Sequence, residues 1–99
     1  MKSSQYRSAN TIIQTILEGI IRAERDDTLL KKGIVKYHLV RYCGLKTTTA
    51  EKYFQKLETA GYIESREEAW GERTIIVYTI TPLGIERHEW FVKINSEIE

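Results

Sequence analysis

Cysteine and proline are almost absent from this sequence, which has one of each among 99 residues. A single cysteine, Cys43, cannot form a disulfide within the chain, which favours a reducing compartment. No apolar run is long enough to span a membrane. The polar segment 1–8 also lacks the apolar stretch of a secretion signal. We therefore expect a cytoplasmic protein with no membrane partner. We expect residues 1–99 to form a single domain, in which residues 1–8 are a polar N-terminal tail.

Signatures of catalysis and metal binding are missing as well. Cys43 and His38 have no second pair of ligands beside them to complete a zinc site, which favours a buried cysteine. His88 stands alone, and Asp26 and Asp27 fit a break between helices better than a carboxylate pair in a cleft. No glycine-rich phosphate loop or nucleophile motif occurs. We expect no enzymatic activity, no metal and no cofactor.

Excess charge of either sign is also scarce overall, but the charges are unevenly distributed. The formal net charge is +1, yet residues 31–56 hold seven basic side chains and one acidic side chain. Residues 57–99 hold four basic and nine acidic side chains. A basic middle and an acidic end indicate one face suited to a polyanion. A solvated charged surface would explain the charges on their own equally well.

Helical spacing marks the first half of the chain. Ile13, Ile16, Leu17 and Ile20 predict a helix from Ser8 to Arg25, capped by Ser8 or Asn10. Gly19 inside this helix weakens it and indicates close packing against a neighbour. A short second helix is expected from about Ile34, ending before Gly44, where a left-handed backbone is needed.

A third helix is expected over about residues 47–60. Thr48 and Glu51 fit a capping box, and Thr47 is an equally reasonable cap. Ala50, Phe54 and Leu57 share one face, which we assign to the core. The opposite face is polar and basic. It carries Thr48, Lys52, Gln55, Lys56 and Thr59, with Thr49 and Tyr53 on its margin.

The period then changes from helical to alternating. Two segments rich in β-branched and aromatic residues, 62–67 and 73–80, predict a hairpin around a turn that contains Gly71. Thr81 and the single proline, Pro82, mark the start of a last helix over residues 81–99. The element order predicts a mainly helical α+β fold of the winged helix-turn-helix type: three helices, a two-stranded wing and a C-terminal helix.

The segments GLKTTTAEKYFQKLETAGYIE and YTITPLGIE resemble the winged-helix DNA-binding proteins of archaea and their viruses. The likeness covers roughly residues 10–95, and its positions are Leu45, Thr47, Lys52-Tyr53-Phe54, Gly61-Tyr62-Ile63 and Thr81-x-x-Gly84. It implies a DNA-binding regulator or chromatin protein, usually dimeric through an antiparallel C-terminal helix, in the cytoplasm of the host if viral. The hairpin departs from the family because Glu67, Glu68 and Glu72 make it acidic, which argues against a contact between the wing and DNA.

Candidate DNA contacts lie in and around the third helix, because the N-terminal part of this helix enters the major groove in helix-turn-helix proteins. Threonine and lysine suit phosphates and base edges, and glutamine suits adenine. Arginines of the hairpin suit the minor groove. The candidates are Lys36, Arg41, Lys46, Thr47, Thr48, Thr49, Lys52, Tyr53, Gln55, Lys56, Arg66 and Arg73.

Two aromatic residues have more than one reading. Tyr53 lies beside Phe54, so partial burial fits it as well as a DNA contact does. Trp70 at the hairpin tip can pack back on the domain, form a protein interface or touch DNA, since an exposed indole wastes its burial energy.

The last helix has more apolar surface than a domain of this size needs. It can pack against the first helix, or it can form a two-fold interface that presents two third helices to half-sites about one DNA turn apart. The candidate interface residues are Ile12, Ile21, Trp90, Phe91, Ile94 and Ile98. The sequence therefore predicts a transcriptional regulator that binds double-stranded DNA as a homodimer. The alternatives are a protein-interaction module and a non-specific chromatin-architectural protein.

Overall fold

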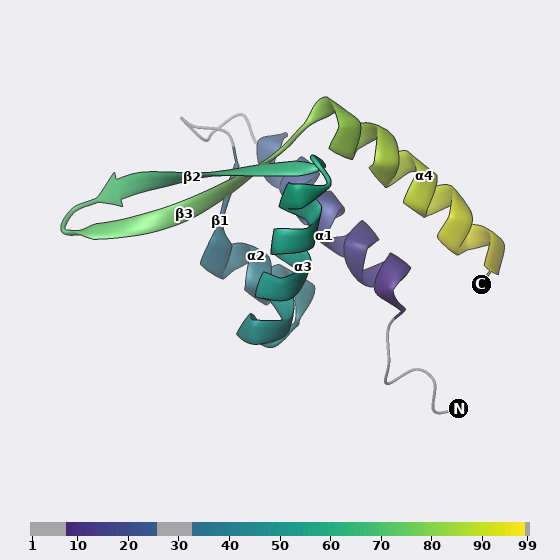
Figure 1. Ribbon diagram of the computed structural model, residues 1–99, viewed down its shortest axis with the longest axis horizontal. Helices are drawn as coiled ribbons and strands as arrows, with labels where there is room; N and C mark the ends of the chain where they lie inside the picture. The colour runs from purple at the N-terminus through teal and green to yellow at the C-terminus, as the bar shows by residue number, and fades with distance from the viewer. Residues whose placement is uncertain (1–7, 26–32, 99) are drawn as a thin grey trace.

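The computed structural model describes residues 8–25 and 33–98 of the chain. These residues form an α+β fold, mainly helical, with four helices and a three-stranded antiparallel sheet (Figure 1). The elements are α1 (Ala9–Glu24), β1 (Ile34–Val35), α2 (Lys36–Cys43), α3 (Thr47–Thr59), β2 (Ile63–Trp70), β3 (Arg73–Ile80) and α4 (Pro82–Ile98). Most of the polar tail and the expected helix break at Asp26 and Asp27 lie outside the described residues.

The mainly helical α+β class expected from the sequence is confirmed, but the sheet has a strand that was not expected. Strand β1 pairs Ile34 with Tyr78 and Val35 with Val77, so the strand order is β1-β3-β2. A strand of two residues is too short to show an alternating pattern. Helix α2 accordingly begins at Lys36, two residues later than expected.

Helix α1 provides the centre of the core. Ser8 caps it, because its hydroxyl oxygen accepts a hydrogen bond from the N–H of Thr11 at 3.1 Å. Ile16, Leu17 and Ile20 are fully buried. A Cβ at Gly19 would lie 2.8 Å from the ring of Tyr42, so the close packing expected at this glycine is confirmed.

A turn of three residues joins α2 to α3. Gly44 ends α2 with φ +67°, and its N–H donates to the carbonyl oxygens of Val40 and Arg41. Helix α3 starts at Thr47, with Lys46 at the N-cap position and no side chain of the described residues bonded to its first turn. The expected caps, Thr47 and Thr48, are therefore wrong. Both threonines already lie inside the helix, where their hydroxyls cannot cap its start.

The other end of α3 closes as a Schellman motif. Gly61 has φ +84°, and its N–H donates to the carbonyl of Glu58 at 3.0 Å. The N–H of Tyr62 donates to the carbonyl of Leu57 at 2.9 Å. The chain thus leaves the helix in a fixed direction and enters β2 at Ile63.

The β2–β3 hairpin is longer and its turn tighter than expected. Trp70 pairs with Arg73, which leaves only Gly71 and Glu72 in the turn. Gly71 has φ +63° and Glu72 has no positive φ, a combination typical of a type II′ turn. The hairpin extends beyond the helices at one end of the molecule, and α4 lies towards the other (Figure 1).

The start of α4 is held against the segment that joins α3 to β2. The hydroxyl oxygen of Thr81 accepts a hydrogen bond from the N–H of Gly84 at 3.0 Å, which confirms Thr81 as the cap. The N–H of Thr81 donates to the carbonyl of Tyr62 at 3.1 Å. A Cβ at Gly84 would lie 2.0 Å from the same carbonyl oxygen, so no other residue fits there without movement of the backbone.

Helix α4 packs along α1, as one of the two readings of the sequence proposed. Phe91 is buried in the same core cluster as Ile12 and Ile16. Buried Asn95 donates from Nδ2 to Gln14 Oε1 at 2.6 Å. Among the described helices, none combines the length and the apolar character needed to cross a membrane.

Replacement of Gly84 by alanine should lower the free energy of unfolding by about 3 kcal/mol, the upper end of overpacking costs, because the added methyl group meets backbone. Urea denaturation followed by circular dichroism measures this change. Glu86→Ala is the matched control, since Glu86 is an exposed residue of the same helix and should change stability by less than about 0.5 kcal/mol. Equal effects of the two substitutions would show that the close approach at Gly84 is wrong.

The burial of Tyr78 should make the protein less stable at alkaline pH. Burial raises the pKa of the Tyr78 phenol above its ordinary value of 10.0, and the nearby carboxylates of Glu58 and Glu51 add to the effect. The unfolded chain therefore releases this proton first, and stability falls as the pH rises above 10, by up to about 1.4 kcal/mol per pH unit. Urea denaturation of the wild type and of Tyr78→Phe at pH 9 and pH 11 measures the contribution of Tyr78 ionisation to this loss of stability. The same pH dependence in both proteins would contradict it.

Candidate nucleic-acid interface

Helix α3 has one buried face and one polar face, as its spacing predicted. Ala50, Phe54 and Leu57 are buried in the core. The opposite side chains are exposed and together line a shallow surface depression; they are Lys52, Gln55, Lys56 and Thr59. Two lysines, an amide and a hydroxyl therefore share a single surface that can bind an extended polyanion.

The N-terminus of α3 adds hydrogen-bond donors beside this surface. Thr47 and Thr48 are exposed, and Thr49 is half-buried. The first bond within the helix runs from the N–H of Ala50 to the carbonyl of Lys46 at 2.9 Å. The backbone N–H groups of the three threonines therefore precede the helical ladder, and the helix dipole favours an anion at this end.

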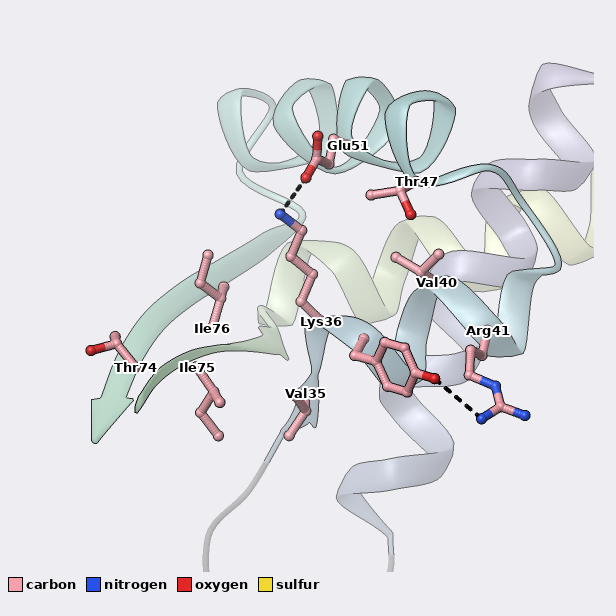
Figure 2. Close-up of a pocket in the computed structure, with 10 residues that line it drawn as sticks. Val35, Lys36, Val40, Arg41, Thr47, Glu51, Thr74, Ile75 and Ile76 are labelled. Carbon is pink, nitrogen blue, oxygen red and sulfur yellow. Dashed lines mark hydrogen bonds and ion pairs between the residues drawn. The ribbon is translucent and has the colours of Figure 1, made fainter. Parts of the chain in front are cut away.

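One acidic residue of α3 is neutralised by α2. The Nζ of Lys36 lies 2.5 Å from Glu51 Oε2, and Figure 2 shows the lysine side chain extending from the start of α2 to reach it. Lys36 is therefore engaged in an ion pair with Glu51, which makes it less available to a phosphate than an unpaired lysine would be. The remaining basic candidates of this region, Arg41 and Lys46, are exposed, and the Arg41 guanidinium lies 5.7 Å from the centre of the Tyr37 ring.

Tyr53 belongs to the core side of α3. Its side chain is half-buried and packs against the core cluster that contains Phe54 and Leu57. Of the two alternatives that the sequence left open for Tyr53, the structure therefore shows the partial burial.

The hairpin brings opposite charges together. Arg66 is half-buried and pairs with Glu68 on the same strand, whereas Arg73 is exposed. Trp70 pairs across the strands with Arg73 and is 68% exposed, so it does not pack back on the domain. Three further carboxylates are exposed on the hairpin: Glu64, Glu67 and Glu72. This part of the surface is therefore poorly suited to a phosphate backbone.

A groove that the sequence did not reveal lies between the hairpin, α2 and the start of α3. Its volume is about 440 Å³, and its apolar walls include Val35, Val40, Ile75 and Ile76 (Figure 2). Thr47 and the Lys36–Glu51 pair stand at its α3 side. It exists because β1 ends after two residues, which no periodicity in the sequence could indicate.

The expected interface on α4 is only partly available. Ile12 and Phe91 fill the core of the single chain, and Ile21 and Ile94 are half-buried. Trp90 remains 51% exposed. The side chain of Ile98 lies outside the described residues. Two exposed apolar residues were overlooked in the sequence although their spacing of seven is typical of one helix face: Ile85 and Val92.

The residues considered for metal or covalent chemistry do not come together. Cys43 is buried in the core, as expected, whereas His38 is exposed on α2. Within residues 8–25 and 33–98, no group of three or more side chains is arranged to hold a metal ion. No protein-family model matches the chain, and no curated protein sequence matches it.

Proposed function

We propose that this protein is a winged-helix transcriptional regulator that binds double-stranded DNA with α3 in the major groove. The observation that carries the proposal is the exposed face of α3, where Lys52, Gln55, Lys56 and Thr59 form one surface opposite a fully buried face. A helix joined to its predecessor by a short turn and followed by a hairpin is the arrangement in which such a face reads DNA.

The groups around α3 suit the parts of a duplex differently. Lys46, Lys52 and Lys56 are exposed and would neutralise phosphates on either side of the groove. The uncapped N-terminus of α3 would hold a further phosphate through backbone N–H groups. Gln55 is the side chain suited to a paired contact with adenine, so it would carry sequence preference.

The hairpin would contribute less than α3 to affinity. Arg73 is the exposed cation near its tip, but Glu64, Glu67 and Glu72 would repel the DNA backbone. The exposed indole of Trp70 instead favours the second candidate function, a protein-interaction module, because large exposed aromatic side chains are typical of protein interfaces.

The proposal includes a homodimer, formed through α4. Ile85 and Val92 are exposed, and together with half-buried Ile21 they line a cleft between α4 and α1. Burial of this apolar surface against a second copy would place two α3 helices on half-sites of one duplex. Such a regulator would act in the cytoplasm, in contact with the DNA.

Removal of a lysine from α3 should weaken duplex binding. Lys52→Ala and Lys56→Ala are each expected to raise the Kd by about tenfold and to reduce the slope of log K against log salt by about one, since each would lose a phosphate contact. Fluorescence anisotropy with a labelled duplex selected from a random pool, at several salt concentrations, gives both values.

Lys93→Ala is the matched control for these variants, because Lys93 is an exposed lysine of α4 and should leave the Kd and the slope unchanged. Absence of salt-dependent binding to any duplex at low ionic strength would refute the proposal. A selected pool without a shared sequence would favour an architectural protein over a regulator.

The dimer should dissociate when its apolar surface receives a charge. Val92→Asp is expected to convert a dimer to a monomer in sedimentation velocity, since burial of the carboxylate at the interface would remove its hydration. Lys93→Asp, at the neighbouring exposed position, should remain dimeric. A wild-type protein that sediments as a monomer at all concentrations would remove this part of the proposal.

A further inference from the structure

We propose that the groove between α2, the start of α3 and β3 binds an acidic peptide in an extended conformation, which adds to β3 as a strand in line with β1. This is an interaction surface separate from the polar face of α3. It is carried by three observations: a free strand edge, an apolar groove beside that edge, and a net charge of +1 among the side chains that line the groove.

The free edge belongs to β3. Strand β1 pairs only with Val77 and Tyr78, because the chain turns into α2 at Lys36. The part of β3 that continues towards the hairpin tip, residues 74–76, is paired with β2 on one side. No strand of the described residues lies along its other side, the side on which β1 would lie if it were longer.

The alternation of β3 shows which backbone groups lie on that edge. The N–H of Ile80 points away from β2, since it donates to Glu24 Oε2 on α1 at 2.8 Å. Backbone groups of alternate residues point to the same side of a strand. The N–H and C=O groups of Ile76 and Thr74 therefore face the groove, beyond the end of β1.

The groove offers space and apolar contacts for the added strand. Its volume is about 440 Å³, and Thr74, Ile75 and Ile76 form one wall of it. Val35 and Val40 stand across from them (Figure 2). In strand addition, the backbone supplies hydrogen bonds and the pockets accept alternate side chains. A strand that follows β1 along residues 74–76 would meet both at once.

A peptide fits this edge better than a nucleic acid does. The edge presents donors and acceptors in turn, as another peptide backbone does. A phosphodiester provides acceptors alone, so it would leave the carbonyl groups of Thr74 and Ile76 unpaired. The apolar side chains of Val35, Val40 and Ile76 also offer no partner to a phosphate.

Charge around the groove selects acidic side chains on the peptide. The ion pair between Lys36 and Glu51 cancels within the groove. Arg41 then remains as the net charge of the lining, and exposed Arg73 precedes Thr74 at the tip end of the edge. The exposed hairpin carboxylates Glu67 and Glu72 are not among the side chains that line the groove. A peptide that alternates valine with aspartate or glutamate would match both the apolar walls and these two cations.

Occupation of the groove would regulate the proposed DNA binding, a consequence that rests on the proposed function. Thr47 and Arg41 line the groove and are also candidate DNA contacts. A peptide strand that covers them would therefore exclude the duplex, so an acidic partner would act as an antagonist of DNA.

The test uses a fluorescein-labelled peptide, Asp-Val-Glu-Val-Asp-Val-Glu amide, titrated with the full chain in an anisotropy assay. We expect saturable binding. Two matched peptides should bind at least about tenfold more weakly: one N-methylated at alternate residues, which removes ladder donors, and one with lysine in place of each acidic residue. No saturable binding, or equal binding of either matched peptide, would overturn the proposal.

Variants of the chain locate the site. Thr74→Pro removes an N–H that faces the groove and none that pairs with β2, so it should lower the affinity for the peptide by about tenfold. Thr74→Val keeps this N–H and should leave the affinity unchanged. Arg41→Glu, at an exposed position of α2, should weaken it as well and serves if the proline variant does not fold. Unchanged affinity in Arg41→Glu and in a folded Thr74→Pro would place the peptide elsewhere and overturn the proposal.

Competition with a labelled duplex separates the two proposals. Displacement of the duplex by the peptide supports the antagonism, and simultaneous binding of both overturns it. Binding of the peptide by a chain that binds no duplex would refute the proposed DNA-binding function and leave the peptide site standing.

Discussion

The carbonyl group of Tyr62 is the point on which the arrangement of the elements depends. It accepts a hydrogen bond from the N–H of Thr81, and Gly84 lies so close to it that a methyl group would not fit. The end of α3, the start of β2 and the start of α4 therefore meet at one backbone atom. Because Gly61 fixes the direction in which the chain leaves α3, the hairpin and α4 both take their orientation from this junction.

Much of this fold could be predicted from the sequence, because its signals are local. Helical spacing gave α1 and the two faces of α3, and Gly44, Gly61 and Pro82 marked boundaries that the structure confirms. The failures have non-local causes. A strand as short as β1 has no period, and the ion pair of Lys36 with Glu51 joins residues fifteen positions apart. Neither contact can be inferred before the elements are packed.

The candidate site was predictable in its residue types and less so in their surroundings. The polar face of α3 follows from its spacing alone, since the apolar residues fix which side is buried. Whether each charged side chain is exposed or ion-paired does not follow from the spacing. Arg66 was expected to be available and pairs with Glu68, while Arg73 on the neighbouring strand is exposed. Tyr53 and Trp70 likewise needed tertiary packing to show that one is half-buried and the other exposed.

The length of the hairpin has a consequence for how this protein could diverge. Its buried residues, among them Ile63 and Tyr78, lie near the base, and the outer part carries no core. Natural variation could therefore exchange Trp70 and other side chains of the tip at little thermodynamic cost, provided that glycine is kept at position 71. Changes in length would have to come as two residues per strand, because a single insertion moves every side chain beyond it to the opposite face. Such a segment lets recognition evolve while the helices that support it stay the same.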